Sequence, residues 1–518
     1  MGSVTSDRAQ SSSARSPIGV PRRAISRPIV AGVASLSALL LIVSQTGAVY
    51  DGDEGLHLVG AMLVRAGQRP FVDFFYWHEP IYLYVAAAWM TIAGESWRSV
   101  HLLSAALTAV TAFLIASYLP GYIRAKDGPA WWGLVAASCF ALSVLVLKWG
   151  TIGHNYALCL MLSVVAFRLA AGTVNLPGVS RSFWAGLFAG AAAATSLLVS
   201  LLVPVMLLWL VICCPAGTRL TKAASFLAGA IIPFSPLALL ASQAPYETFF
   251  GLVDHHLTYR VPVSYASAIH VETLSSWMTS PQALLLIFLA GIGMVTVARD
   301  GSSDTRRDAY LCAALALSLG IFAAVAHPPA RMPYFVVATP FVAILAAIGA
   351  FTLTRRSRRV RGHWMALAVV VIFGLGALAS FYRERLWTSE WRRIEAFAEE
   401  VNRVSAPGGS FYTSYPFVYF AARRLPPEGL ENGWATRMML PLESFTRLEV
   451  MSDARLVDRV RSGFFDTTLL GRDDPRYEAA TMERAYRDSM LLDPSFVLRW
   501  NPRRPSGENT AEPARRNP

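Results

Sequence analysis

The chain has 518 residues, of which 54% are hydrophobic and only 15% are charged. This balance excludes an ordinary soluble protein of several domains and indicates that the bilayer is the main solvent. The formal net charge of +12 would suggest a nucleic-acid partner in a soluble protein. Here, however, much of the excess lies in short loops between apolar runs, where Lys and Arg mark the cytoplasmic side. We therefore expect a multi-pass membrane protein with no nucleic-acid partner.

Nine apolar runs reach the roughly 17 residues that a membrane-spanning helix needs. They cover residues 29–49, 99–119, 131–147, 155–173, 223–242, 282–298, 309–326, 334–353 and 364–381. The block 183–214 is longer than one span needs and carries Thr195, Ser196 and Ser200 in its middle, which predicts two short helices. The sequence thus predicts a polytopic α-helical membrane protein with about eleven transmembrane helices.

The loops between these runs predict the orientation. Residues 81–94 are apolar but too short for a span, so we expect them on the outer membrane surface. With eleven spans, Lys and Arg collect in alternate loops, most densely in residues 354–363, and these loops should face the cytoplasm. The prediction is an inner (plasma) membrane protein with a cytoplasmic N-terminus and an extracytoplasmic C-terminus.

Four regions follow from this pattern. Residues 1–28 are rich in Ser and Arg and predict a disordered cytoplasmic tail, and residues 29–383 form the membrane body with a first outer loop at 50–98. Residues 384–502 are more polar, and apolar positions at helical spacing within 390–404 are followed by Pro-Gly-Gly and an aromatic run. We expect a small extracytoplasmic α+β domain there, and a disordered tail at 503–518.

The five cysteines lie in or at the ends of apolar runs. In that setting cysteine behaves as a small apolar side chain. Their spacing predicts neither a disulfide framework nor a zinc site.

The first outer loop holds the densest group of ionisable residues. Five carboxylates and two histidines lie between residues 51 and 79, beginning where the first span ends, at the depth of a lipid headgroup. A carboxylate there can act as a general base, an effect of about 10² to 10⁴ in rate, or can hold a divalent cation against a phosphate. The alternative is that acids are simply tolerated on the outer side. For His57 we expect an interfacial position without a role.

The order of residues in this loop is also informative. It reads Asp-Glu-Gly at 53–55, Gly-Gln-Arg-Pro-Phe-Val-Asp-Phe-Phe at 67–75 and His-Glu-Pro at 78–80. This pattern resembles the first periplasmic loop of bacterial family C glycosyltransferases (GT-C), the relatives of protein mannosyltransferases and aminoarabinose transferases. A second likeness lies at 326–340, where Arg331 and Tyr334 match the family's Arg-x-x-Tyr segment. The resemblance implies a GT-C fold and a polyprenyl-phosphate sugar as donor.

The resemblance also implies roles. Asp53 matches the catalytic base and Glu54 its acidic neighbour, while Asp73 matches a second acid that orients the acceptor or assists a metal. Arg331 would bind the carrier phosphate, with Tyr334 as a hydrogen-bond donor. The alternative for Arg331 is an interfacial side chain without a partner.

Further candidates for substrate binding are His78, Glu79 and His256. The histidines could serve as metal, sugar or phosphate contacts, or as packed interfacial rings. No metal ligand set is predicted, and a divalent ion stays open as a cofactor. Many GT-C relatives have a basic residue where this chain has Thr195-Ser196, which leaves the donor phosphate contacts open.

The predicted function is extracytoplasmic transfer of a sugar, with inversion, from a polyprenyl-phosphate donor to a hydroxyl of a glycan, lipid or protein. One alternative is a transporter or flippase of lipid-linked saccharides, which would need ionisable groups inside the spans. Candidate charges lie mostly at span edges. A second alternative is a non-catalytic scaffold, in which Asp53 would be freely replaceable.

Overall fold

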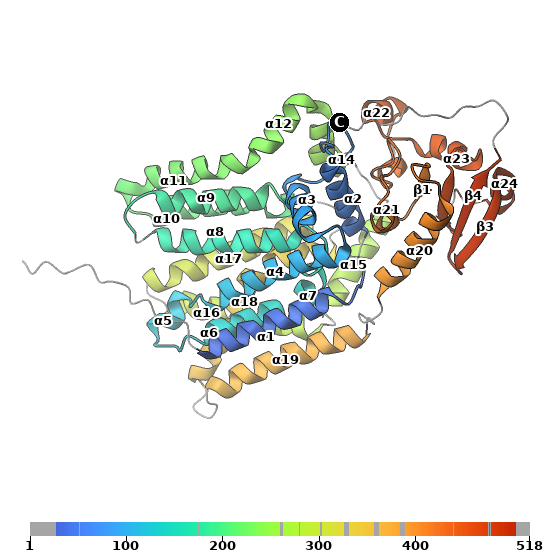
Figure 1. The fold of residues 1–518 in the computed structure, drawn as a ribbon. Coiled ribbons are helices and arrows are strands. Elements are labelled where there is room, and N and C mark those ends of the chain that lie inside the picture. Colours follow the sequence, from blue (N-terminus) through green and yellow to red (C-terminus); the bar gives the residue numbers. More distant parts are fainter. Residues whose placement is uncertain are drawn as a thin grey trace, which may run out of the picture.

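The computed structural model describes residues 27–50, 52–174, 176–258, 263–278, 280–300, 303–325, 331–356, 362–383, 389–438, 440–474, 476 and 478–503. These residues form a helical bundle and, at one end of it, a C-terminal part of mixed helices and strands (Figure 1). The two tails predicted to be disordered lie almost wholly outside the described residues.

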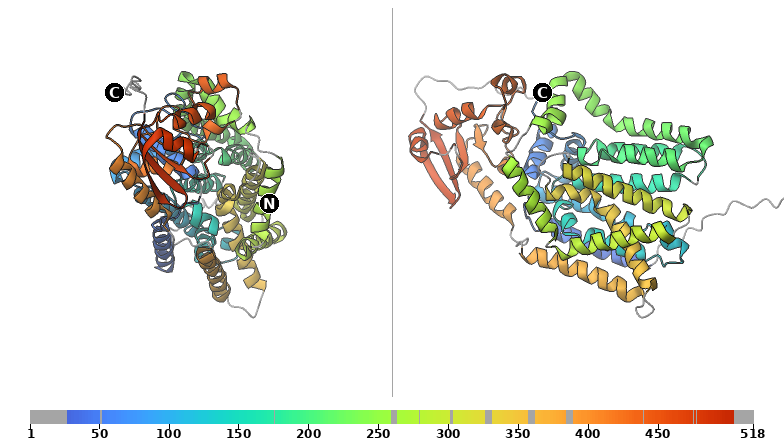
Figure 2. Two further views of the ribbon diagram at one scale, coloured as in Figure 1. Left: turned by 90° about the vertical axis from the view of Figure 1, so that its right-hand side faces the viewer. Right: turned by 180° about the vertical axis from the view of Figure 1, so that it is seen from behind.

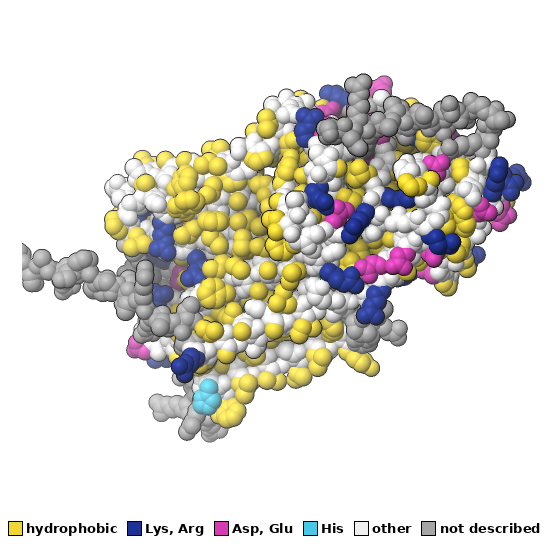
Figure 3. Space-filling model, viewed as in Figure 1, with side chains coloured by type: hydrophobic (Ala, Val, Ile, Leu, Met, Phe, Trp, Pro, Cys, Tyr) yellow, Lys and Arg dark blue, Asp and Glu magenta, His cyan; other side chains and the backbone are white. Residues whose placement is uncertain are grey.

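The bundle consists of helices that run side by side along one direction (Figures 1 and 2). They are α1 (Arg27–Ser44), α4 (Trp97–Ala116), α6 (Trp132–Ala141), α7 (Val144–Trp149), α8 (Tyr156–Thr173), α9 (Ser180–Ala193), α10 (Leu202–Cys213), α11 (Ala216–Ile231), α12 (Ser235–Gln243), α16 (Pro281–Asp300), α17 (Ser303–Val325), α18 (Thr339–Arg356) and α19 (Gly362–Arg383). On the face shown in Figure 3 the surface of the bundle is largely apolar, and charged side chains gather toward its two ends.

Within the described residues, eight helical stretches are long and apolar enough to cross a membrane. The polytopic helical membrane fold is therefore confirmed. The block 183–214 is split as predicted, because α9 ends at Ala193 and α10 starts at Leu202 with the short helix η1 (Leu197–Val199) between them. The total of eleven spans stays a prediction.

Small residues bring bundle helices close together. On α16 and α18, Gly293 and Gly349 face each other's helix, and a Cβ atom at Gly349 would overlap the carbonyl oxygen of Leu289. In a membrane, where apolar side chains gain little by leaving lipid, such close backbone contact is a main source of helix association.

The loops at the end that carries the C-terminal part are themselves helical (Figure 1). The predicted first outer loop contains α2 (Asp53–Arg65) and α3 (Ile81–Ala93). The loop after α12 contains α13 (Pro245–Phe249), a π-helical turn η3 (Phe250–Asp254), α14 (His255–Thr258) and α15 (Val263–Met278). The opposite end carries α5 (Gly121–Ala125).

The C-terminal part has the expected α+β composition. Its elements are α20 (Glu390–Val404), β1 (Phe411–Thr413), α21 (Pro416–Ala422), η5 (Ala435–Arg437), α22 (Leu442–Arg447), α23 (Asp453–Arg461), β2 (Thr467–Gly471), α24 (Ala479–Ala485), β3 (Tyr486–Asp493) and β4 (Phe496–Pro502). The sheet has the order β1-β2-β4-β3, with β1 parallel to β2 and the other pairs antiparallel. The predicted helix 390–404 is confirmed.

Contacts on two sides join this part to the bundle. At the start of α20, the buried ring of Trp391 stacks on Trp97 of α4 with 5.6 Å between centroids. The backbone N–H of Trp391 donates to the carbonyl of Gly47 at 3.0 Å. On the other side, the guanidinium of Arg447 lies 3.6 Å from the ring centroid of Tyr246 on α13. Between these contacts, α21 packs on α2, so the C-terminal part covers the helix that starts with Asp53.

Candidate active site

The helix α2 starts at the two acids that the sequence analysis selected. Gly52 is the N-cap, and Asp53 and Glu54 form the first turn, where negative charge is favoured by the helix dipole. Asp53 is half-buried, whereas Glu54 has 0% of its surface exposed. The two adjacent acids thus have different environments, one open to a ligand and one enclosed by protein.

The enclosed acid, Glu54, joins three segments. Its Oε1 contacts Nε2 of His101 on α4 and accepts from the backbone N–H of Gly153 at 3.1 Å. Nδ1 of His101 lies 2.8 Å from the carbonyl oxygen of Ser44, at the end of α1. Because a carbonyl oxygen only accepts, Nδ1 of His101 carries a proton. The contact between Nε2 of His101 and Oε1 of Glu54 therefore needs a second proton, held by one of these two atoms. Glu54 therefore positions the start of α2 against α1 and α4.

Next to Asp53 lies a buried group of aromatic and imidazole rings. Nδ1 of His57 is 2.7 Å from the hydroxyl of Tyr76. Burial raises the pKa of Tyr76, with smaller contributions from Glu79, Tyr82 and Asp53 in that order. The ring of His154 lies 4.6 Å from that of His57. These contacts connect the surroundings of Asp53 to the loop that precedes α8.

His57 corrects the sequence analysis. Instead of an interfacial ring, it is a core residue with 1% of its surface exposed. Burial, followed by the neighbouring rings of His154 and His78, lowers the pKa of His57, so it stays neutral at pH 7. His57 is buried because it lies on the face of α2 that points into the protein.

Glu79 is a buried carboxyl group in the loop between α2 and α3. Burial raises the pKa of this carboxyl group to about 7. Hydrogen bonds from the backbone N–H groups of Glu79 itself and of Leu197 lower the pKa, but burial is the larger effect. The Leu197 contact links this loop to η1, close to the Thr195-Ser196 turn. A carboxyl group near half-protonation at neutral pH suits proton transfer or binding of a cation.

The two other predicted substrate-binding histidines lie beside this loop. Nε2 of His78 accepts from the indole N–H of Trp77 at 3.1 Å, and Nε2 of His256 donates to the carbonyl of Trp77 at 3.1 Å. Their ring centroids are 6.5 Å apart, and burial lowers the pKa of His256. The structure thus brings His78 and His256 together around Trp77.

Asp73 has a different surrounding. It forms a two-pronged ion pair with Arg69, with Nε and Nη2 each 2.9 Å from a carboxylate oxygen, and it also accepts from the Arg69 backbone N–H at 2.7 Å. Arg69 continues to Oε1 of Gln243 at 2.7 Å. The geometry of these bonds fixes the loop against α12.

Arg331 is exposed and precedes the short helix η4 (Met332–Ala338), in which the Tyr334 N–H donates to the Arg331 carbonyl at 3.1 Å. This helix packs against α7 and η1, and η1 also contacts Glu79. The preceding residues 326–330, which carry part of the family likeness, lie outside the described residues.

The sequence analysis missed the segment 150–155 and its contacts. Gly153 binds Glu54, and Nδ1 of His154 lies 2.7 Å from Oδ1 of Asn155, whose amide donates to the carbonyl of Thr195 at 3.1 Å. Nothing in the local sequence shows that these residues face α2. Across the described residues, no three or more His, Cys, Asp or Glu side chains form a group that could hold a metal ion.

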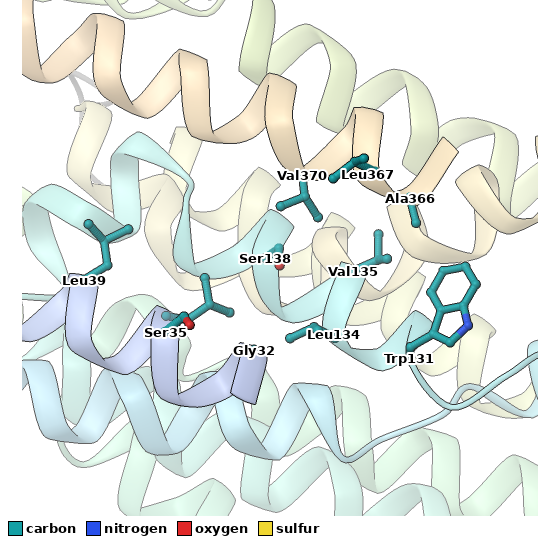
Figure 4. A pocket seen from close by; sticks show the side chains of 11 residues that line it. Gly32, Ser35, Leu39, Trp131, Leu134, Val135, Ser138, Ala366, Leu367 and Val370 are labelled. Carbon is teal, nitrogen blue, oxygen red and sulfur yellow. The ribbon is translucent and has the colours of Figure 1, made fainter. Parts of the chain in front are cut away.

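An apolar pocket of about 460 Å³ lies between α1, α6 and α19, and none of the polar site residues lines it (Figure 4). Its lining includes Ser35, Leu39, Leu134, Val135 and Val370 and has no ionisable side chain. It suits a lipid chain and is not part of the polar site.

Comparison with solved structures shows which known fold the chain has. The chain resembles ArnT from Cupriavidus metallidurans, at 13% identity and a TM-score of 0.61 both in the apo state and bound to undecaprenyl phosphate. In the apo comparison it covers 91% of this chain and 97% of ArnT. The chain has the GT-C fold. No family model and no curated protein matches the sequence.

Two larger GT-C proteins have the same fold. The Archaeoglobus fulgidus oligosaccharyltransferase matches at 11% identity and a TM-score of 0.50, over 89% of this chain and 73% of its own. The mycobacterial arabinofuranosyltransferase AftD matches at 14% identity and a TM-score of 0.51, over 94% of this chain and 40% of AftD. The fold resemblance implied by the first outer loop is therefore confirmed.

Proposed function

We propose that the chain is an integral-membrane glycosyltransferase that moves a sugar from a polyprenyl-phosphate donor to an acceptor hydroxyl. The observation that carries the proposal is the half-buried Asp53 on the first turn of α2, at the bundle end that carries the C-terminal part, in a chain with the GT-C fold. The bound undecaprenyl phosphate in ArnT supports a lipid-phosphate carrier. We take the extracytoplasmic side to be this end.

In the proposed reaction, Asp53 accepts the proton of the acceptor hydroxyl. The acceptor oxygen then bonds to the anomeric carbon, and the bond from that carbon to the carrier phosphate breaks on the opposite face, which inverts the configuration. The leaving polyprenyl phosphate takes the electron pair, and Arg331 offsets its negative charge.

The remaining residues hold the base and the substrates. Glu54 and His101 fix the turn that carries Asp53. Glu79, His78 and His256 form the polar wall in which the sugar and phosphate would be bound, and Tyr334 would donate to the phosphate. The proposed reaction specifies the acceptor only by its hydroxyl group and the transferred sugar only by its lipid-phosphate carrier.

The test uses purified protein in lipid nanodiscs with a panel of polyprenyl-phosphate sugars and acceptors, and measures release of free polyprenyl phosphate. Asp53→Asn removes the base at nearly constant size and should lower this release by about 10² to 10⁴. The matched control is Asp127→Asn, the same chemical change at an exposed position before α6, at the opposite end of the bundle. Release at the wild-type rate by Asp53→Asn overturns the assignment.

A further inference from the structure

Trp434 of the C-terminal part lies against the first turn of α2. A Cβ atom at Gly52 would be 3.5 Å from both Cζ2 and Nε1 of the indole, and Gly52 directly precedes Asp53. Although it makes this contact, Trp434 keeps 48% of its surface exposed. The indole therefore lies against the residue that precedes the proposed base and still has an exposed surface.

This exposure is unusual within the C-terminal part. Among its described residues, Trp434 is the only aromatic side chain classed as exposed, while the other tryptophans and tyrosines are buried or partly buried. Large aromatic side chains are normally the main source of core packing. Because this open indole lies beside the turn that carries the proposed base, and tryptophan is enriched among residues that contribute most to binding, we take its exposed face as a candidate binding surface.

A cation accompanies the ring. The guanidinium of Arg437 lies 5.7 Å from the Trp434 ring centroid, and its side chain is 43% exposed, although it also approaches Asp474 at 3.8 Å. The indole and the guanidinium thus offer a flat apolar face next to hydrogen-bond donors.

The turn that carries these two side chains is held in place. The backbone N–H of Trp434 donates to Oδ1 of the buried Asn432 at 3.2 Å, and the Thr436 hydroxyl donates to the carbonyl of Gly433 at 3.0 Å. A platform with a fixed backbone loses little entropy when a ligand binds.

A saccharide fits these features. A sugar ring has a face of C–H groups that packs on an aromatic ring, and a rim of hydroxyls that accept from a guanidinium. A peptide acceptor can instead bind by adding a strand to a sheet edge. Of the two edge strands of this sheet, β1 and β3, the β3 edge lies on the side of the C-terminal part that is remote from α2 (Figure 1).

We propose that Trp434 and Arg437 form a platform that binds a saccharide acceptor and presents one of its hydroxyls to Asp53. The inference deepens the proposed function and rests on it for the role of Asp53. The acceptor class is thereby narrowed from any hydroxyl compound to a glycan.

Binding can be tested without donor, by saturation-transfer NMR with methyl α-D-mannopyranoside and methyl α-D-arabinofuranoside added to the full chain in nanodiscs. Wild-type protein should saturate the ring C–H protons of at least one glycoside. Trp434→Ala should bind it about tenfold more weakly, the ratio that corresponds to about 1.4 kcal/mol. Trp434→Phe keeps a ring and should stay within about threefold of wild type.

The matched control is Leu442→Ala, which removes an apolar side chain of the same part that is 71% exposed and should leave binding unchanged. The proposal is overturned if neither glycoside binds wild type, if Trp434→Ala binds as well as wild type, or if a Ser-containing peptide binds through Trp434 in their place. Glycoside binding through Trp434 with no release of polyprenyl phosphate would reject the proposed reaction and leave the platform standing.

Discussion

His101 on α4 contacts the carboxylate of Glu54 on α2, with both side chains almost completely buried at 1% and 0% exposure. The contact joins residues 47 positions apart and fixes the turn on which Asp53 lies. Such a pair tolerates the loss of one partner poorly, because the other is left in the protein interior with an unmatched polar group.

The first prediction concerns this pair. His101→Ala should lower the free energy of unfolding by about 3 kcal/mol, within the range for breaking a buried pair, and should also lower the rate of sugar transfer. His101→Gln can donate an amide N–H to Glu54 and should recover most of the stability. Thermal unfolding in detergent measures the first effect and carrier-phosphate release the second. Equal stability of His101→Ala and wild type would show that the pair does not brace α2.

The second prediction follows from Glu79, whose pKa burial raises to about 7. Because the folded pKa lies above the ordinary value of 4.5, the folded state binds the proton more tightly than the unfolded state does. The contribution of the protonated Glu79 carboxyl group to the free energy of unfolding is fully present below about pH 4.5 and is lost as the pH rises through 7. Over that window the loss is about 3 kcal/mol by order of magnitude.

Glu79→Gln stays neutral at every pH, so the difference in unfolding temperature between wild type and this variant isolates the titration of Glu79. Wild type should lose stability relative to Glu79→Gln between pH 4.5 and 7, where the shift of the pKa acts. Arg69→Gln, a change outside the buried core of the loop, serves as a control and should show the wild-type dependence of the unfolding temperature on pH between 4.5 and 7. A difference that stays constant with pH, or changes in the opposite direction, would contradict the raised pKa.

The third prediction separates two roles for Asp73. In its ion pair with Arg69 the two side chains are 32% and 51% exposed, so solvent screening leaves the pair a small contribution to stability. If Asp73 acts by holding Arg69, then Asp73→Asn, Arg69→Gln and the double variant should lower transfer by similar factors, because all three remove one interaction. A much larger loss in Asp73→Asn than in Arg69→Gln would instead indicate direct contact with substrate or metal.

The sequence by itself determined the properties that depend on local composition. Apolar runs long enough for a bilayer are visible in the chain and agree with the eight long apolar helical stretches of the described residues. The break in the block 183–214 agrees with the separation of α9 from α10. The helical periodicity of residues 390–404 gave α20 with the same buried face. The pattern of the first outer loop, at 53–55, 67–75 and 78–80, selected Asp53 and Glu54 as candidates and indicated the GT-C fold.

Only the tertiary structure decided which residues surround those acids. His101, Gly153 and Trp434 come from α4, from the turn before α8 and from the C-terminal part, and no local pattern connects them to α2. His57 has no sequence feature that separates a buried ring from an interfacial one. The physical reason is that hydrophobic length sets each helix independently, whereas burial, pKa and hydrogen-bond partners arise where helices distant in sequence pack together.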